Sequence, residues 1–137
     1  MSGLYQQALI EHHKKPIGFE RVFNASHQAS GENLACGDEI QVSLEIDESN
    51  INNVAFNGDS CAICRASASI MCKTIHNKTV KDVKTLLFEV QGFLQEGSKQ
   101  ALSSIPDELS PLIAVRSYPV RLQCAQLPWS TLERAIS

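Results

Sequence analysis

The sequence has no long hydrophobic run, and no stretch approaches the ~20 consecutive apolar residues of a membrane span. Its first residues, MSGLYQQALIEHHKK, lack the charged start, apolar block and cleavage site of a secretory signal. A strong excess of either charge is also missing. The formal net charge is −3 and the pI is about 5.8, so nothing electrostatic favours nucleic acid or a membrane surface as a partner. We expect a cytoplasmic protein that binds neither.

Cysteines are few, odd in number and unevenly spaced. Five such cysteines do not predict a disulfide framework, and cytosolic thiols are kept reduced, so metal or redox chemistry is favoured. A second C-x-x-C is missing, which excludes a paired zinc ribbon around Cys61 and Cys64. A dithiol redox site at a helix start stays open for these two residues, although the strand and helix alternation of a thioredoxin-like fold is absent. For Cys64 and Cys72, packing on or beside a helix is the plainer interpretation.

The N-terminal half of the chain predicts one helix and a short antiparallel sheet. The length fits a single domain over residues 1–137. A first helix ends before Pro16, and one short strand fits around residues 26–30. Residues 39–46 alternate between polar and apolar as in a half-buried strand, and turn residues then lead into a returning strand at 51–58.

From Cys61 the apolar period becomes helical. One helix is expected to end near Asn77 with a left-handed cap, and TVKD resembles a capping box that opens the next helix. Later helices are predicted to start at Ser110, to cover residues 120–127, and to resume after Pro128. Strands first and helices later indicate an α+β domain.

The stretch NLACGDEIQV places Cys36, Gly37 and Asp38 at the mouth of the clear strand. On an extended backbone, side chains two residues apart lie on the same side, and a thiolate repels a carboxylate unless a cation lies between them. Cys61, at a strand-to-helix junction, and Cys124, in a late helix, could add two more thiolates. Zinc accepts this donor set, and thiolates also suit iron–sulfur clusters. The alternative, that these cysteines are small buried hydrophobes, stays open on spacing alone.

Four segments follow one another along the chain: LYQQALIEHHKKP, ACGDEIQVSLEID, FNGDSCAICRASASIM and VRLQCAQLPWSTLERAI. Together they resemble the N-terminal helix, the C-G-D motif and the two later cysteine motifs of the iron–sulfur scaffold family of IscU-like and NifU N-terminal domains. The resemblance covers nearly all of the chain. It implies an α+β fold with a small antiparallel sheet of about three strands and helices packed on one face.

The long spacing between Cys61 and Cys124, with no histidine just before Cys124, is similar to the SufU form of the family. The resemblance implies four metal ligands: Cys36, Asp38, Cys61 and Cys124. It also implies three positions beside the site: Gly37, Arg121 and Gln123. This chain departs from the pattern at Gln123, where SufU-type proteins usually have lysine, and at Ser60, which replaces a glycine. Cys64 is an extra thiol that could be an alternative ligand or a resolving thiol.

The resemblance further implies a role in iron–sulfur cluster assembly, as a scaffold or sulfur-relay protein rather than an enzyme. In one form the protein binds zinc, and Cys36 accepts persulfide sulfur from a SufS-type cysteine desulfurase. In the other, the same ligands hold iron in a [2Fe–2S] cluster for other assembly or acceptor proteins, with Asp38 as the labile ligand. The competing hypotheses are an interaction module with structural zinc and a dithiol oxidoreductase that uses Cys61 and Cys64.

Overall fold

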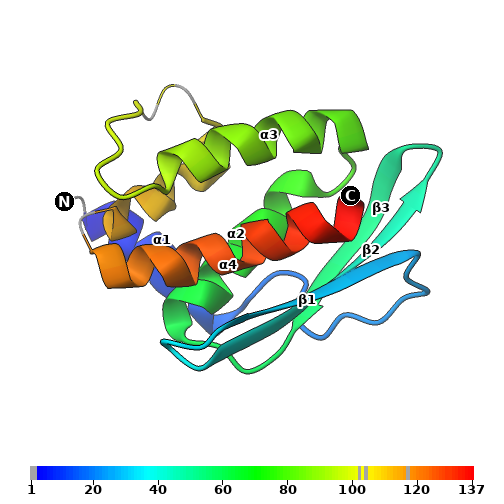
Figure 1. Cartoon of the computed structure of the whole chain (residues 1–137), viewed down its shortest axis with the longest axis horizontal. Coiled ribbons are helices and arrows are strands. Elements are labelled where there is room, and N and C mark those ends of the chain that lie inside the picture. Colours follow the sequence, from blue (N-terminus) through cyan, green and yellow to red (C-terminus); the bar gives the residue numbers. More distant parts are fainter. Residues whose placement is uncertain (1–2, 102, 104, 117) are drawn as a thin grey trace.

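The structure is a computed structural model that describes residues 3–101, 103, 105–116 and 118–137. One N-terminal helix precedes three strands, and the remaining helices follow (Figure 1). The elements are α1 (Gly3–Lys14), β1 (His27–Asn33), β2 (Asp38–Asp47), β3 (Asn50–Asn57), α2 (Ala62–Ile75), α3 (Val80–Phe93), the 3₁₀ helix η2 (Asp107–Val115) and α4 (Pro119–Ile136). This is the predicted α+β arrangement. No helix in the described residues is long and apolar enough to cross a membrane.

The strands form one antiparallel sheet in the order β1-β2-β3. Along the central strand, Ile40, Val42 and Leu44 are buried while the residues between them are more exposed, as the period-two pattern predicts. Val42 pairs with Phe56 and Leu44 with Val54 across the ladder, so both strands contribute to one apolar face.

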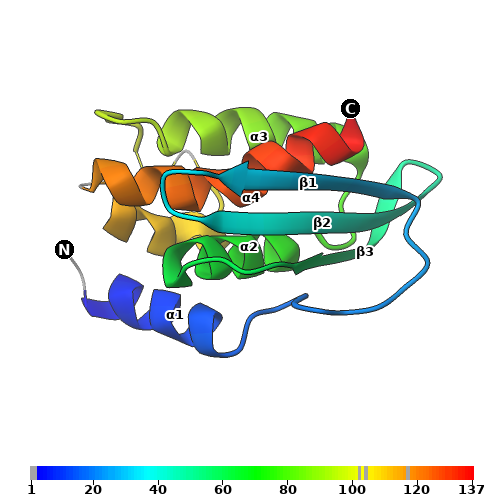
Figure 2. The same cartoon turned by 60° about the horizontal axis from the view of Figure 1, so that its bottom comes forward.

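The helices cover one face of the sheet, as expected. α4 contacts β1 and β2 and packs beside α2, while α3 packs on α4 on the side away from the sheet (Figure 1). α1 packs against α2 and η2. The opposite face of the sheet carries no helix in the described part of the chain (Figure 2).

A glycine lets α4 approach the sheet closely. A Cβ on Gly31 of β1 would lie 2.2 Å from the Oγ1 of Thr131 on α4, which is far inside van der Waals contact. The absence of a side chain at this position therefore fixes how close the last helix comes to the strand that leads toward Cys36.

A buried serine joins α2 to α4. The hydroxyl of Ser67 donates to the carbonyl oxygen of Ala125 at 2.6 Å and accepts from the indole Nε1 of Trp129 at 3.0 Å. Small residues around it let the two helices approach each other. This contact positions the start of α2 relative to the helix that carries Cys124.

Both predicted helix caps are present. Asn77 has a left-handed φ of +66° just after α2. The side chain of Thr79 accepts the backbone N–H of Asp82 at 3.1 Å and begins α3, as expected for the TVKD motif.

Three predicted boundaries are wrong. α4 continues through Pro128 instead of ending there; the proline cannot donate to the Cys124 carbonyl, but packing of α4 against the sheet, α2 and α3 outweighs that loss. The 3₁₀ helix begins at Asp107 rather than Ser110 and contains Pro111. β1 is longer than residues 26–30 because the ladder with β2 extends to Asn33.

Candidate metal centre

Three distant segments meet beside the first turns of α2 and α4. The ligand atoms of Cys36, Asp38 and Cys124 all lie within 4.8 Å of one another. The Sγ atoms of Cys124 and Cys36 are 3.5 Å apart, although 88 positions separate them in the sequence. We refer to these three residues together with Cys61 as the candidate centre.

A tight turn between β1 and β2 presents Cys36. Gly37 has a left-handed φ of +72°, so a side chain there would be strained although a Cβ would meet no atom within 4 Å. The expectation of an extended backbone between Cys36 and Asp38 is therefore wrong. Their side chains converge because the chain turns: the N–H of Cys36 donates to the carbonyl of Asn33 at 3.2 Å. Cys36 itself is exposed.

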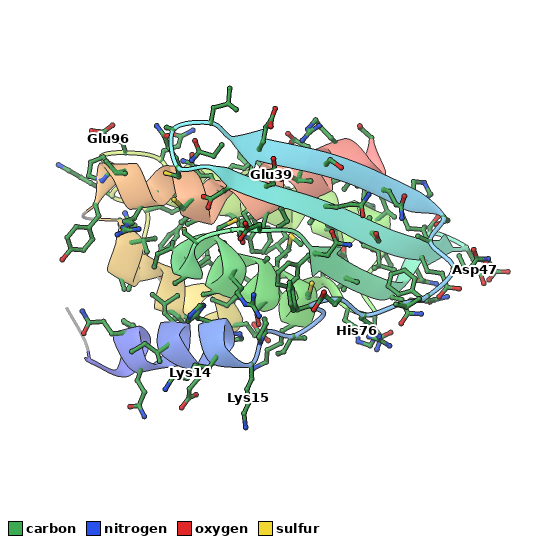
Figure 3. The ribbon with its side chains drawn as sticks, turned by 90° about the horizontal axis from the view of Figure 1, so that it is seen from below. Lys14, Lys15, Glu39, Asp47, His76 and Glu96 are labelled. Carbon is green, nitrogen blue, oxygen red and sulfur yellow. The ribbon has the colours of Figure 1, made fainter. Side chains whose placement is uncertain are left out.

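Asp38 is the first residue of β2 and is only 1% exposed. Its Oδ1 accepts the backbone N–H of Cys61 at 2.7 Å. Its Oδ2 is buried without a hydrogen-bond partner in the described part of the chain. The neighbouring Glu39 lies on the outer, exposed side of the strand (Figure 3). A buried, unpaired carboxylate oxygen is costly, and a cation beside the two thiols would satisfy it, so the residues present fit a metal ion.

Cys61 is the N-cap of α2. Its φ of −68° and ψ of 168° are extended, and its Sγ accepts the backbone N–H of Cys64 at 3.5 Å. The backbone N–H of Cys61 donates to the Asp38 carboxylate, and this hydrogen bond joins the start of β2 to the start of α2.

Cys124 is fully buried in α4. Burial raises the pKa of its thiol, and the neighbouring thiols of Cys36 and Cys61 and the carboxyl of Asp38 raise it further. Its Sγ also lies 3.8 Å from the carbonyl oxygen of Val120. A cation among these groups would favour their charged forms instead, because bound metals deprotonate the thiols that ligate them.

The remaining sequence candidates lie around the candidate centre or away from it. Arg121 is exposed on α4, in a hollow shared with Leu9 of α1, and Gln123 is exposed in a hollow beside Asn33. Their predicted roles beside a metal stay predictions. Cys72 packs where a Cβ on Gly18 would come within 2.7 Å of its Sγ, which supports the packing interpretation.

Two apolar side chains beside the candidate centre were not anticipated. Leu34, in the turn that carries Cys36, is 85% exposed, and Val120, one helical turn before Cys124, is 68% exposed. A leucine in the turn next to Cys36 is a sequence signal for this surface. The pair gives the rim of the candidate centre an apolar character.

The amino-acid sequence of this chain is similar to those of known proteins. The family model described as NifU-like N terminal domain matches residues 4–137. The zinc-dependent sulfurtransferase SufU of Bacillus subtilis is 31% identical over 100% of this chain and 92% of its own length. The iron–sulfur cluster assembly scaffold protein IscU of Thermotoga maritima is 26% identical over 97% of this chain and 92% of its own length.

A solved structure shares the whole fold. The crystal structure of a putative iron–sulfur cluster assembly scaffold protein for the SUF system from Fervidobacterium islandicum superposes with a TM-score of 0.83, at 28% identity, over 100% of both chains. The arrangement of strands and helices described above is therefore that of an experimentally known fold.

Proposed function

This chain belongs to the family of NifU-like N-terminal domains, and from that premise we propose that it serves iron–sulfur cluster assembly as a zinc-dependent sulfur acceptor. The similar SufU protein is named a zinc-dependent sulfurtransferase, and similar IscU and SUF-system proteins are named assembly scaffolds. In this proposal the chain relays sulfur in the cytoplasm and does not act as an enzyme on its own.

The observation that carries the proposal is the convergence of Cys36, Asp38 and Cys124 within 4.8 Å. We propose these residues and Cys61 as the ligands. Three sulfurs and one carboxylate match the ligands that zinc takes in tetrahedral sites. Bound zinc would keep the thiols deprotonated and therefore nucleophilic near neutral pH.

Cys36 is the proposed sulfur acceptor. It is the exposed thiol of the candidate centre and lies in a turn, whereas Cys124 is fully buried. Its thiolate attacks the outer sulfur of a persulfide on the donor protein. A bond forms between Cys36 Sγ and that sulfur, the donor's S–S bond breaks, and the donor cysteine leaves as a thiolate.

The proposed donor is a SufS-type cysteine desulfurase. A donor persulfide must reach Cys36 while the rest of the candidate centre stays covered. The exposed Leu34 and Val120 beside it supply apolar contact area of the kind that a partner protein buries. Other iron–sulfur assembly or acceptor proteins would receive the sulfur afterwards.

The test is persulfide transfer to variants in which one cysteine is replaced by alanine. After incubation with desulfurase and cysteine, intact-mass analysis should show one added sulfur atom on the wild-type chain, mapped to Cys36 by peptide mass. Cys36→Ala should take up none, while Cys72→Ala, which removes a thiol buried elsewhere on α2, should behave as the wild type. Continued sulfur uptake by Cys36→Ala would remove Cys36 from the acceptor role.

A cluster-scaffold function is the second candidate, because the same thiolates suit a [2Fe–2S] cluster and similar proteins are named scaffolds. Metal analysis and absorption spectra of anaerobically purified protein separate the two. A colourless protein with about one zinc per chain supports sulfur relay, and a brown protein with iron and sulfide supports the scaffold.

A further inference from the structure

A second buried polar atom without a hydrogen-bond partner lies at the base of the turn that carries Cys36. Among the described residues three buried side-chain atoms lack such a partner: Nδ2 of Asn33, Oδ2 of Asp38 and Nε of Arg65. The Arg65 guanidinium lies 4.0 Å from the centre of the Phe19 ring. The other two atoms are a donor and an acceptor. Because leaving a buried polar group unpaired is costly, this complementary pair requires an explanation.

The sheet places the two residues opposite each other. Asn33 is the last residue of β1, Asp38 is the first of β2, and the two are paired in the antiparallel ladder. Residues paired in this way point to the same face of a sheet, with Cβ atoms about 4.5–5.5 Å apart. The terminal atoms of both side chains lie two bonds beyond Cβ, and their last torsion rotates over a broad range. A hydrogen bond between the amide and the carboxylate therefore needs only side-chain rotation.

The remaining polar atoms of both residues are already engaged. Oδ1 of Asn33 accepts the N–H of Ala35 at 3.2 Å, and its carbonyl oxygen accepts the N–H of Cys36 at 3.2 Å. Oδ1 of Asp38 accepts the N–H of Cys61 at 2.7 Å. Each side chain thus has one terminal atom bound to the backbone and one left over. The acceptor left over on Asp38 is the oxygen that fits a metal ion.

Resting on the function proposed above, we infer that Asn33 is a positioning residue for the proposed ligand Asp38. In the zinc-bound protein, Nδ2 of Asn33 donates to Oδ2 of Asp38. A carboxylate oxygen has two lone pairs, so Oδ2 can bind a cation with one and accept the amide N–H with the other. This hydrogen bond holds the oxygen in a fixed direction. Loss of a partner that orients a metal ligand weakens metal binding by about 10–100-fold.

The test is a double-mutant cycle on zinc affinity, measured by competition with a chromophoric chelator. In the wild-type background, Asn33→Ala should weaken zinc binding at least about tenfold. In the Asp38→Ala background the same substitution should weaken it by no more than about threefold, because the carboxylate that Asn33 positions is gone. A role confined to the turn would weaken zinc binding equally in both backgrounds.

Two further variants complete the experiment. Asn33→Ser lacks the amide donor but keeps an oxygen that can accept the N–H of Ala35, so it preserves the turn and should show the same dependence on Asp38. Asn57→Ala is the matched control, because Nδ2 of Asn57 donates to Oε1 of Gln41 at 3.3 Å across the neighbouring ladder, on exposed surface. It removes a cross-strand amide of the same kind and should leave zinc affinity unchanged. Far-UV circular dichroism checks that each variant is folded.

The possible outcomes separate this inference from the proposed function. Equal losses of zinc affinity in the two backgrounds would overturn the inference and leave Asn33 with the turn alone. Wild-type affinity in Asn33→Ala, or an equal loss in Asn57→Ala, would also overturn it. A wild-type chain that binds no zinc would refute the proposed function itself.

Discussion

Asp38 performs a separate task with each of its two carboxylate oxygens. Oδ1 accepts the amide N–H of Cys61, while Oδ2 is buried beside the thiols of the candidate centre with no hydrogen-bond partner among the described residues. The hydrogen bond of Oδ1 stabilises the fold, whereas Oδ2 is the oxygen proposed to bind the metal. Substitutions that keep one oxygen and lose the other can therefore separate them.

We predict that Asp38→Asn and Asp38→Ala differ in stability but not in metal binding. Asparagine keeps an oxygen for the Cys61 amide, so the metal-free variant should stay within about 1 kcal/mol of the wild type in urea unfolding. Alanine leaves that amide without its acceptor and should cost about 1–3 kcal/mol. Both should lose zinc affinity by tenfold or more, since neither offers a carboxylate. An unchanged zinc affinity of Asp38→Asn would exclude Asp38 as a ligand.

For single residues, the sequence predicts which side chains come together at the candidate centre. It does not predict the turn and the hydrogen bond that position them. Cys36, Asp38 and Cys124 are recognisable from their motifs, and the structure brings them together. The bond from Asp38 to the Cys61 amide is not readable, because it depends on where α2 begins relative to β2. The turn at Gly37 depends on the pairing of β1 with β2.

Among the elements, α1 and the segment that follows it share one buried hydroxyl of α2. The Oγ of Ser69 accepts the N–H of Ile17 at 2.8 Å and lies 2.7 Å from Nδ1 of His12. With the N–H of Ile17 occupying one lone pair, the hydroxyl proton can be donated to a neutral imidazole. Protonation of His12 would place a second donor against the same oxygen.

We predict that this attachment weakens in mild acid. Burial lowers the pKa of His12, Lys73 lowers it further, and Glu11 opposes them. The unfolded chain, with a histidine pKa of about 6.5, therefore binds the proton first, so the stability supplied by neutral His12 is present above that pH and lost below it. Between pH 7.5 and 5.5 the wild type should lose up to about 1 kcal/mol more than His12→Asn, a small figure because water reaches part of the ring.

Urea unfolding at the two pH values measures this difference, with His13→Asn as the matched control on an exposed neighbour. If His12→Asn and the wild type lost the same stability on acidification, the ring would not be the titrating group at this contact. A wild type that gained stability in acid would contradict the direction of the pKa shift.

The elements that the sequence predicts well are those whose own pattern fixes them. β2 alternates clearly, and Thr79 and Asn77 mark helix ends by local chemistry. β1 has no such pattern, because its buried face is covered by α4 at Gly31 and needs small residues there. The passage of α4 through Pro128 depends in the same way on packing from several sides.

At the scale of the whole molecule, the candidate centre adjoins the core, because Cys124 belongs to the buried cluster and Cys61 packs against it. The buried apolar side chains form one cluster that runs from β2 through α2 to α3 and α4. The candidate centre lies at one end, where the β1–β2 turn, the start of α2 and the first turns of α4 meet. A metal there would join three segments that the core already holds near one another. That residues 1–137 form one domain stays a prediction.

We therefore predict that chelation lowers the melting temperature of the protein without unfolding it. The metal-free chain should keep its far-UV circular dichroism and melt in one cooperative transition, as a single domain does. Zinc at a thousandfold excess over its dissociation constant adds about 4 kcal/mol to the native state, which for a chain of this size raises the melting temperature by roughly 10 °C. Calorimetry before and after chelation, with zinc added back, measures both effects. Loss of all secondary structure on chelation would instead support a purely structural zinc, and an unchanged melting temperature would mean that the native fold does not hold the ion.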